Sequence, residues 1–367
     1  MANHRDSFRI IKLGSKIYQT DLNQVCVYLF HYICAIIPII YFMKVTKIAS
    51  YLFFFFSPFC MSAQTSPSSA NAASGESGST VISNPLKPEP LKQKGKFFVY
   101  WGYNRSIYTS SNIHIWGDGY DFTLHNVTAK DKPVSYSLFY LSPNNVTIPQ
   151  YNLRFGYYIN DKTFISFGQD HMKYVIDKQT TLINGVISKD NTGGKNIGIY
   201  NNKEILIGEG GGNTESNGYN GPSIIDSLPK GYASEFEHCD GLNDFSAEIG
   251  RVDQLWISKK RNFVLTADGT GGAGMILADT RADILGYPSG HDLNGKKTFH
   301  LAGFSASASL GLKFYFGKHF FALTRLKAGY INLPDINTTT LGGKASQQLW
   351  FCEPMFVLGY TIGKNQK

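Results

Sequence analysis

The segment from Ala302 to Phe316, AGFSASASLGLKFYF, alternates between two kinds of side chain. Its even-numbered positions are all apolar, and its odd-numbered positions are nearly all small or polar. Successive side chains point to opposite faces of a β-strand, so the segment predicts a strand with one apolar and one polar face. A typical strand has about five or six residues, whereas a tilted strand that crosses a bilayer needs about nine to eleven. The segment therefore predicts a membrane strand with lipid outside and a polar lumen inside.

Seven further segments show the same alternation of side chains. They begin near Phe97, Leu153, Ile165, Asn243, Asn262, Phe320 and Trp350. Short turns at 160–162, 258–261 and 317–318 alternate with long connections at 118–150, 176–242, 280–297 and 332–346. Membrane barrels place short turns in the periplasm and long loops outside the cell. The sequence therefore predicts an all-β fold: an antiparallel up-and-down transmembrane β-barrel of eight strands with long extracellular loops.

Two loop segments leave a ten-stranded barrel as the alternative. Asp121–Val127 and Tyr232–Asp240 would give ten strands if both entered the barrel wall. We expect them instead to form hairpins in the loops above the membrane. We also predict a β-bulge near Arg251–Asp253, where the alternation changes phase, and another at Pro354, because proline has no N–H for a regular ladder position.

The first 95 residues differ from the rest in composition. Residues 43–63 resemble a secretory signal peptide, with a basic start, an apolar core and a Met-Ser-Ala site before Gln64. We interpret residues 1–42 as an extension before the true start at Met43, although Val25–Phe42 is long enough for a transmembrane helix. Residues 64–95 are rich in Ser, Ala, Gly and Pro and predict a disordered periplasmic linker. Residues 96–367 form the predicted barrel domain.

Charge gives little support for a nucleic-acid partner. The chain has 35 basic and 27 acidic residues, but six basic and two acidic ones precede Gln64, which leaves 29 and 25. This excess is small and dispersed, so we expect no nucleic-acid partner. Aromatic residues make up 14% of the chain and it contains 37 glycines, a composition typical of strands and turns.

The inward positions of the predicted strands carry charges of both signs. We predict four basic and four acidic side chains in the lumen: Arg154, Lys313, Arg325 and Lys327 with Asp170, Glu248, Asp268 and Glu353. The interior of an eight-stranded barrel is just wide enough for side chains to fill, and charges buried there need partners. We therefore interpret these residues as a plug of ion pairs, with a narrow gated pore as the alternative.

A second polar group is expected at the extracellular rim of the barrel. Asp170 and His171 end the third predicted strand, while Glu237 and His238 lead into the fourth, its neighbour. A carboxylate beside an imidazole can orient a general base or bind a cation, so these four are the candidate catalytic residues. Solvated loop polarity is the alternative. Their spacing matches no defined metal motif, and we expect no metal and no other cofactor.

A lipid-modifying acyl hydrolase or transferase is the enzymatic alternative. Ser166 lies on an inward face near Asp170 and His171, and His291–Asp292 lies in the third long loop. The sequence contains no Gly-x-Ser-x-Gly nucleophile elbow. An activity of this kind is therefore less well supported than a role without catalysis.

Aromatic residues gather in the first two long loops. They are His114, Trp116, Tyr120 and Phe122 in the first loop, and Tyr219, Tyr232 and Phe236 in the second. Aromatic side chains at exposed loop tips favour partner binding, but they are equally suited to covering the barrel mouth. The sequence leaves both interpretations open.

The whole pattern resembles the small outer-membrane β-barrels of the OmpA/OmpX/OmpW type. The resemblance covers residues 96–363 and rests on the signal peptide, the eight strands, the alternating loop lengths and an aromatic last strand. The stretches KFFVYWGYNRS and GDGYDFTL also resemble uncharacterised barrel proteins of this class. The resemblance implies an integral protein of the outer membrane. We expect a monomer surrounded by outer-membrane lipids, with a structural role or an extracellular ligand or protein partner bound through its loops.

Overall fold

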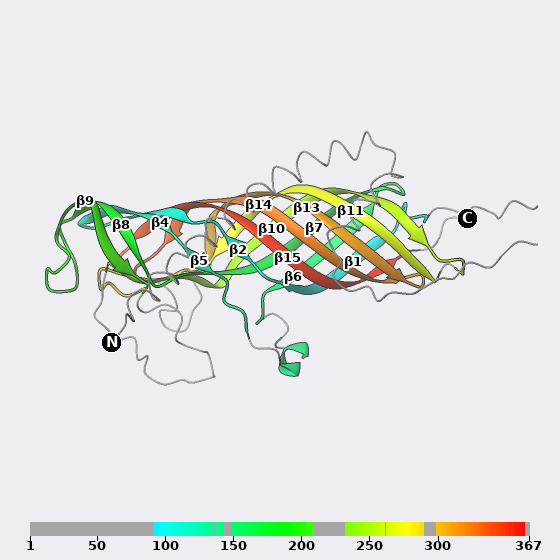
Figure 1. The fold of residues 1–367 in the computed structure, drawn as a ribbon, viewed down its shortest axis with the longest axis horizontal. Helices are drawn as coiled ribbons and strands as arrows, with labels where there is room; N and C mark the ends of the chain where they lie inside the picture. The colour runs from blue at the N-terminus through cyan, green and yellow to red at the C-terminus, as the bar shows by residue number, and fades with distance from the viewer. Residues whose placement is uncertain are drawn as a thin grey trace, which may run out of the picture.

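In the computed structural model, a closed ring of antiparallel strands forms the barrel wall (Figure 1). The structure describes residues 91–134, 137–142, 145, 148–208, 232–260, 262–289 and 299–363. The ring consists of β1 (Phe97–Asn104), β6 (Tyr151–Tyr158), β7 (Thr163–Ile176), β10 (Ala233–Ile257), β11 (Phe263–Ala278), β13 (His300–Phe316), β14 (Phe320–Asn337) and β15 (Lys344–Ile362). β1 pairs with both β6 and β15, which closes the ring. The predicted eight-stranded antiparallel barrel is confirmed.

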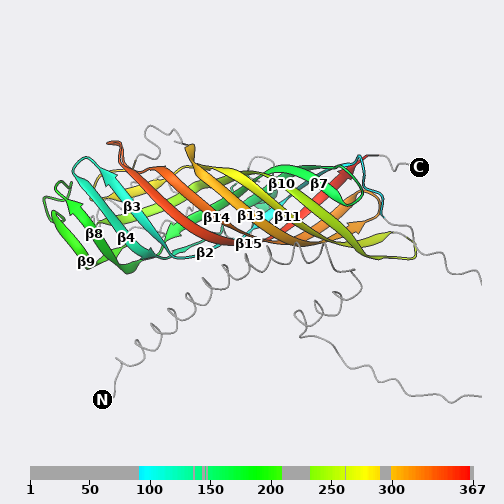
Figure 2. The same cartoon turned by 90° about the horizontal axis from the view of Figure 1, so that it is seen from above.

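The wall continues past the ring as an extension at one end, which we call the extension (Figure 2). It consists mainly of β3 (Ser111–Gly117), β4 (Tyr120–Val127), β8 (Gln179–Ile187) and β9 (Gly198–Ile207), joined to the ring where β3 pairs with β15. The segment predicted at Asp121–Val127 is therefore β4 of the extension, whereas Tyr232–Asp240 mostly prolongs β10 upward and forms no separate hairpin.

Four short elements complete the described fold. They are β2 (Ile107–Tyr108), β5 (Ala129–Lys130), the 3₁₀ helix η2 (Leu138–Leu141) and β12 (Arg281–Ile284). β2 pairs with β15, β5 with β7 and β12 with β10, so each short strand lines the upper wall. Among the described residues, no helix has both the length and the apolarity to cross a membrane.

The outer face of the ring is apolar and the inner face is polar, as the alternation in β13 predicts. Phe304, Leu312 and Phe316 are exposed on the outside, while Ser309 and Lys313 are fully buried inside. Exposed apolar side chains occur on every strand of the ring, including Phe97, Phe155, Ile165, Ile249, Phe263, Phe320 and Leu358. This arrangement is the one that lipid outside a barrel requires.

The lumen is filled by aromatic residues at the end where the short turns lie. Phe98, Tyr158, Phe164, Tyr315 and Phe321 belong to one buried cluster there. Three of these rings lie over a glycine that is their direct cross-strand partner: Phe98 over Gly156, Phe164 over Gly250 and Phe321 over Gly359. A Cβ atom at Gly156, Gly250 or Gly359 would lie only 2.0, 2.3 or 2.1 Å from the ring. The missing side chains give the rings room inside the narrow barrel.

The two predicted irregularities lie elsewhere or are absent. The register of β10 against β11 shifts between Gln254 and Trp256, later in the chain than predicted. No shift occurs at Pro354, because the pairing of β15 with β14 runs through Leu326 opposite Pro354 without interruption. On the other side, Arg105 donates its N–H to the Pro354 carbonyl, and proline has no N–H to donate in return. The neighbouring strand is instead interrupted there, between β1 and β2.

The last residues of the predicted linker are ordered against the barrel. The Leu91 backbone N–H donates to Gln254 Oε1 at 2.8 Å, and Gln93 Nε2 donates to Tyr315 OH at 2.8 Å. Residues 91–95 therefore pack against the end of the barrel where the short turns lie, and this part of the predicted linker is ordered. The remaining proposed segments before the barrel, together with Tyr219 and His291–Asp292, lie outside the described residues.

We predict that Gly156→Val destabilises the barrel by about 1–3 kcal/mol, since a side chain there displaces the Phe98 ring. Heat-modifiable gel migration, in which the folded barrel runs faster than the unfolded chain, measures the effect as a lower conversion temperature. Gly271→Ala is the matched control, because nothing lies within 4 Å of a Cβ atom at that strand position. Equal conversion temperatures for the two variants would contradict the packing of rings over glycines.

Candidate functional site

A network of buried ion pairs occupies the middle of the lumen, above the aromatic cluster. Arg325 Nη2 donates to both carboxylate oxygens of Asp268 at 3.1 Å, and its Nη1 lies 3.4 Å from Glu248 Oε2. Arg154 Nη2 lies 3.2 Å from Glu248 Oε1 and 3.4 Å from Asp170 Oδ2. Glu248 thus joins the two guanidinium groups, which come from opposite parts of the ring.

Two lysines extend this network in both directions. Lys327 Nζ donates to Asp170 Oδ2 at 2.6 Å and to Asp244 Oδ2 at 3.0 Å. Lys313 Nζ lies 3.4 Å from Asp268 Oδ2. It also lies 5.0–5.9 Å from the centroids of four rings, those of Phe98, Tyr158, Phe164 and Phe321. The aromatic cluster and the ion pairs are therefore joined through one ammonium group.

The structure places all eight predicted lumen residues inside the barrel and adds two that the sequence analysis missed. Asp244 Oδ2 accepts a hydrogen bond from Lys327 Nζ. Asn152 Nδ2 donates to Asp170 Oδ1 at 2.7 Å and to Glu353 Oε1 at 3.0 Å. Asp244 lies two residues before the inward-facing Ser246, so the alternation alone indicates its direction. Asn152 precedes the first residue that we assigned to its strand.

Beyond the ion pairs, the extension has an apolar interior. Tyr120, Phe122 and Phe236 are buried there in one cluster with residues of β3, β8, β14 and β15. These three aromatic residues cover the mouth of the barrel. His114 and Trp116, from the same loop, lie on the outer face instead and stack at 4.8 Å. Part of the set is therefore buried and part lies on the surface, and a role of His114 and Trp116 in partner binding stays a prediction.

The four candidate catalytic residues do not form one cluster. Asp170 faces the lumen, while the adjacent His171 faces outward, where it stacks on Tyr151 and its Nδ1 lies 2.8 Å from Asn243 Oδ1. Consecutive side chains of a strand point to opposite faces, so Ser166, which faces inward with Asp170, is separated from His171 by the wall. No Ser–His–acid arrangement results from these residues.

Glu237 and His238 also lie on opposite faces of their strand. Glu237 is buried on the outer side between Lys132, at 3.0 Å, and Arg281, at 3.2 Å. His238 faces the apolar interior beside Tyr174, and its Nδ1 lies 2.8 Å from Thr280 Oγ1. Within the described ranges, no three His, Cys, Asp or Glu side chains are grouped as metal ligands. A catalytic role for these four residues stays a prediction.

Two groups on the part of β10 that lies in the extension have shifted pKa values. Burial, together with the neighbouring Glu237 carboxylate, raises the pKa of Glu235 to about 7. Burial lowers the pKa of the His238 imidazole to about 4. In both cases burial disfavours the charged form of the side chain.

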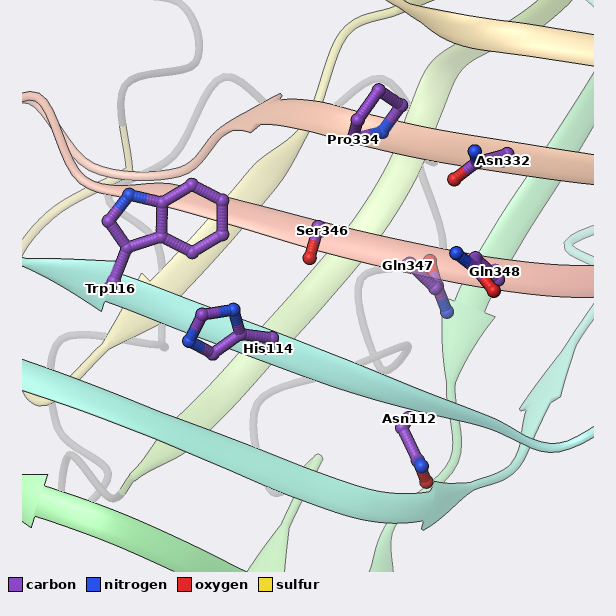
Figure 3. Close-up of a pocket in the computed structure, with 8 residues that line it drawn as sticks. All are labelled: Asn112, His114, Trp116, Asn332, Pro334, Ser346, Gln347 and Gln348. Carbon is purple, nitrogen blue, oxygen red and sulfur yellow. The ribbon is translucent and has the colours of Figure 1, made fainter.

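The outer face of the extension carries a groove beside the barrel wall, with a volume of about 490 Å³. Figure 3 shows the eight residues that line it, which come from β3, β14 and β15. They are Asn112, His114, Trp116, Asn332, Pro334, Ser346, Gln347 and Gln348. The lining combines one indole and one imidazole with uncharged amides and a hydroxyl group.

The fold and its surfaces define a class of protein. The chain forms a β-barrel with an apolar outer face, a lumen lined by buried polar and charged side chains, and an extension of the wall beyond the ring.

No protein-family model and no curated protein matches the chain. Similar solved structures include the outer membrane protein OprG from Pseudomonas aeruginosa, with 11% identity, a TM-score of 0.34, and coverage of 74% of this chain and 98% of that chain. The outer membrane protein AlkL in lipid bilayers has 8% identity, a TM-score of 0.31, and coverage of 77% and 98%. Ail of Yersinia pestis has 10% identity, a TM-score of 0.26, and coverage of 74% and 100%. At these identities the likeness concerns the fold alone.

We predict that Arg325→Met destabilises the barrel by about 3–5 kcal/mol, because Asp268 and Glu248 then lose a buried partner. Lys318→Met removes a positive charge from an exposed turn and should change the stability by less than about 0.5 kcal/mol. Urea titration of both variants in detergent, followed by tryptophan fluorescence, measures the difference. If Arg325→Met lowered the free energy of unfolding no more than Lys318→Met does, the result would contradict the stabilising role of the buried ion pairs.

We predict that Glu235 and His238 have opposite effects on how the stability of the extension depends on pH. Glu235 has a raised pKa, so its contribution to stability is full below about pH 4.5 and is lost as the pH rises through about 7. His238 has a lowered pKa, so its contribution is full above about pH 6.5 and is lost as the pH falls toward about 4.

Glu235→Gln therefore leaves only the histidine dependence, and the stability of the extension should rise more steeply with pH than in the wild type. Hydrogen exchange of residues 233–238, corrected for the intrinsic pH dependence of exchange, measures this. An identical pH dependence in the two proteins would show that Glu235 titrates normally.

Proposed function

We propose that this protein is a closed membrane anchor that presents its extracellular extension as a binding surface. One observation supports this proposal most strongly: buried side chains occupy both ends and the middle of the described barrel, and its wall continues beyond the ring. Aromatic rings fill the periplasmic end, ion pairs fill the middle and an apolar cluster fills the extension. An interior filled in this way suits a scaffold better than it suits transport.

The narrow gated pore is less well supported than this binding role. A conducting path would have to pass the ring cluster around Lys313 and the paired Arg154 and Arg325, all of which are buried. Opening it would separate several buried ion pairs at once, and each broken pair costs several kcal/mol. Among the described residues the enzymatic alternative has no supporting cluster, because the wall separates His171 from Asp170 and Ser166.

Planar-bilayer recording of the protein purified from outer membranes tests the closed barrel. We predict no conductance steps for the wild type, and none for Lys327→Met, which keeps the aromatic cluster intact. Steps in the wild type that shift in Lys327→Met would overturn the proposal and favour the pore.

The binding role itself is tested on an array of immobilised oligosaccharides and extracellular-matrix proteins, with the protein held in nanodiscs. We predict saturable binding by the wild type. A variant in which a short Gly-Ser turn replaces residues 179–207 should keep its heat-modifiable migration and lose most of this binding. Equal binding by both proteins, or binding by neither, would contradict a role for the extension.

A further inference from the structure

The groove on the outer face lies directly above a pair of aromatic residues that face the membrane. Tyr330 and Trp350 are cross-strand partners with ring centroids 5.3 Å apart. The next outward-facing pair on the same two strands is Asn332 with Gln348. Two residues of a strand rise about 7 Å, so the groove begins about one lipid-headgroup layer above the aromatic pair. Aromatic residues of this kind mark the membrane interface of a barrel.

An exposed apolar side chain lies beside the lower end of the groove. Phe304 lies opposite Asn332 across the β13–β14 pairing and is 51% exposed. A molecule in the groove is therefore in contact with the outer leaflet on one side and with solvent on the other. The position suits a molecule that has an acyl part below and a polar part above.

The side chains that line the groove indicate the chemistry of the ligand's polar part. Side-chain amides of Asn332 and Gln348 each carry both donors and an acceptor, which is what a hydroxyl-rich ligand requires. Asn112 adds a donor group, since its Oδ1 already accepts from the Asn126 backbone N–H at 2.9 Å. Trp116 supplies a flat apolar face, and its stacking on His114 fixes the plane of the rings at 28° to each other. The C–H face of a sugar ring packs on such a surface while its hydroxyl groups bind the amides.

The charges around the groove do not favour a phosphate or a carboxylate ligand. No lysine, arginine, aspartate or glutamate is among the lining residues. The neighbouring Lys344 has its Nζ 2.6 Å from Asp335 Oδ1, and His114 Nε2 lies 2.8 Å from Asp121 Oδ1. Gln347 points inward and donates to Tyr174 OH at 2.6 Å, which closes the floor of the groove. Neutral sugar residues fit this environment best.

We propose that the groove binds the saccharide part of a glycolipid in the outer leaflet, with its acyl chains against the apolar face of β13 and β14. The assignment rests on the proposed binding role of the extension and names one ligand class for it. The protein would thereby hold its extension upright in a layer of glycolipid headgroups.

The experiment compares three probes on the protein purified from outer membranes and placed in phosphatidylcholine nanodiscs. They are lipopolysaccharide with a complete core oligosaccharide, lipid A alone, and the free core oligosaccharide. We expect the complete glycolipid to bind at least about tenfold more tightly than either part, which corresponds to ~1.4 kcal/mol. Trp116→Ala should weaken this binding by about tenfold and leave the binding of lipid A unchanged.

Two further variants make the result specific. Gln348→Ala keeps all aromatic residues and should also weaken binding of the complete glycolipid. Trp256→Ala is the matched control, since Trp256 is 51% exposed on the outer face at the periplasmic end, far along β10 from the groove. It should bind all three probes as the wild type does. Heat-modifiable migration verifies that each variant is folded.

The assignment is overturned if lipid A binds as tightly as the complete glycolipid, or if folded Trp116→Ala and Gln348→Ala both bind it normally. Binding of the free oligosaccharide as tightly as the glycolipid would also overturn it, because the ligand would then come from outside the membrane. These failures are distinct from those of the proposed function, which depend on conductance and on the 179–207 replacement.

Discussion

The packing of buried charges inside a narrow ring is the constraint on which the rest of this structure depends. Eight strands leave an interior that side chains fill, so each charge there needs a partner within the wall. Glu248 meets this need for both Arg154 and Arg325, and Asp170 meets it for Arg154 and Lys327. Each of these two carboxylates pairs with two cations, so a substitution on one strand alters ion pairs with several other strands. The network therefore links β6, β7, β10, β11, β13 and β14 across the lumen.

Glycine placement is the second condition for this interior. The rings of Phe98, Phe164 and Phe321 occupy the space that side chains at their cross-strand partners would need. The ring cluster in turn surrounds the ammonium group of Lys313, which lies 3.4 Å from Asp268. Close packing thus continues from the end with the short turns to the ion pairs. Residues 91–95 pack against that end of the barrel. Such an interior suits a rigid support for the extension.

The sequence predicted the ring well because alternation with a period of two is a local property of each strand. Arg154, Glu248 and Lys327 were assigned to the lumen from phase alone. The extension was harder to predict, because β3 and β4 pair with β15 and β8 across long sequence separations. Residues 232–240 were predicted to be a loop segment because the alternation of side chains changes phase at the bulge in β10 between His238 and Leu242.

The prediction of the rim cluster was wrong because it did not apply the alternation of side chains to residues that are adjacent in the sequence. Asp170 and His171 are adjacent in the sequence, and so are Glu237 and His238, which places the members of each pair on opposite faces of a strand. The alternation that located the lumen residues also excludes contact between these neighbours. The groove gave no signal in the sequence, since its lining comes from three strands that only the closed fold brings together.

Thiol labelling of a lumen position tests the central claim, a barrel filled by its own side chains, most directly. Ser309 is fully buried beside Thr270, with the two hydroxyl oxygens 2.6 Å apart. In Ser309→Cys, a small charged thiol reagent should label the folded protein no more than it labels the wild type, and labelling should appear only after heat unfolding. Rapid labelling of the folded variant from either side of the membrane would show a water-filled lumen and contradict the account.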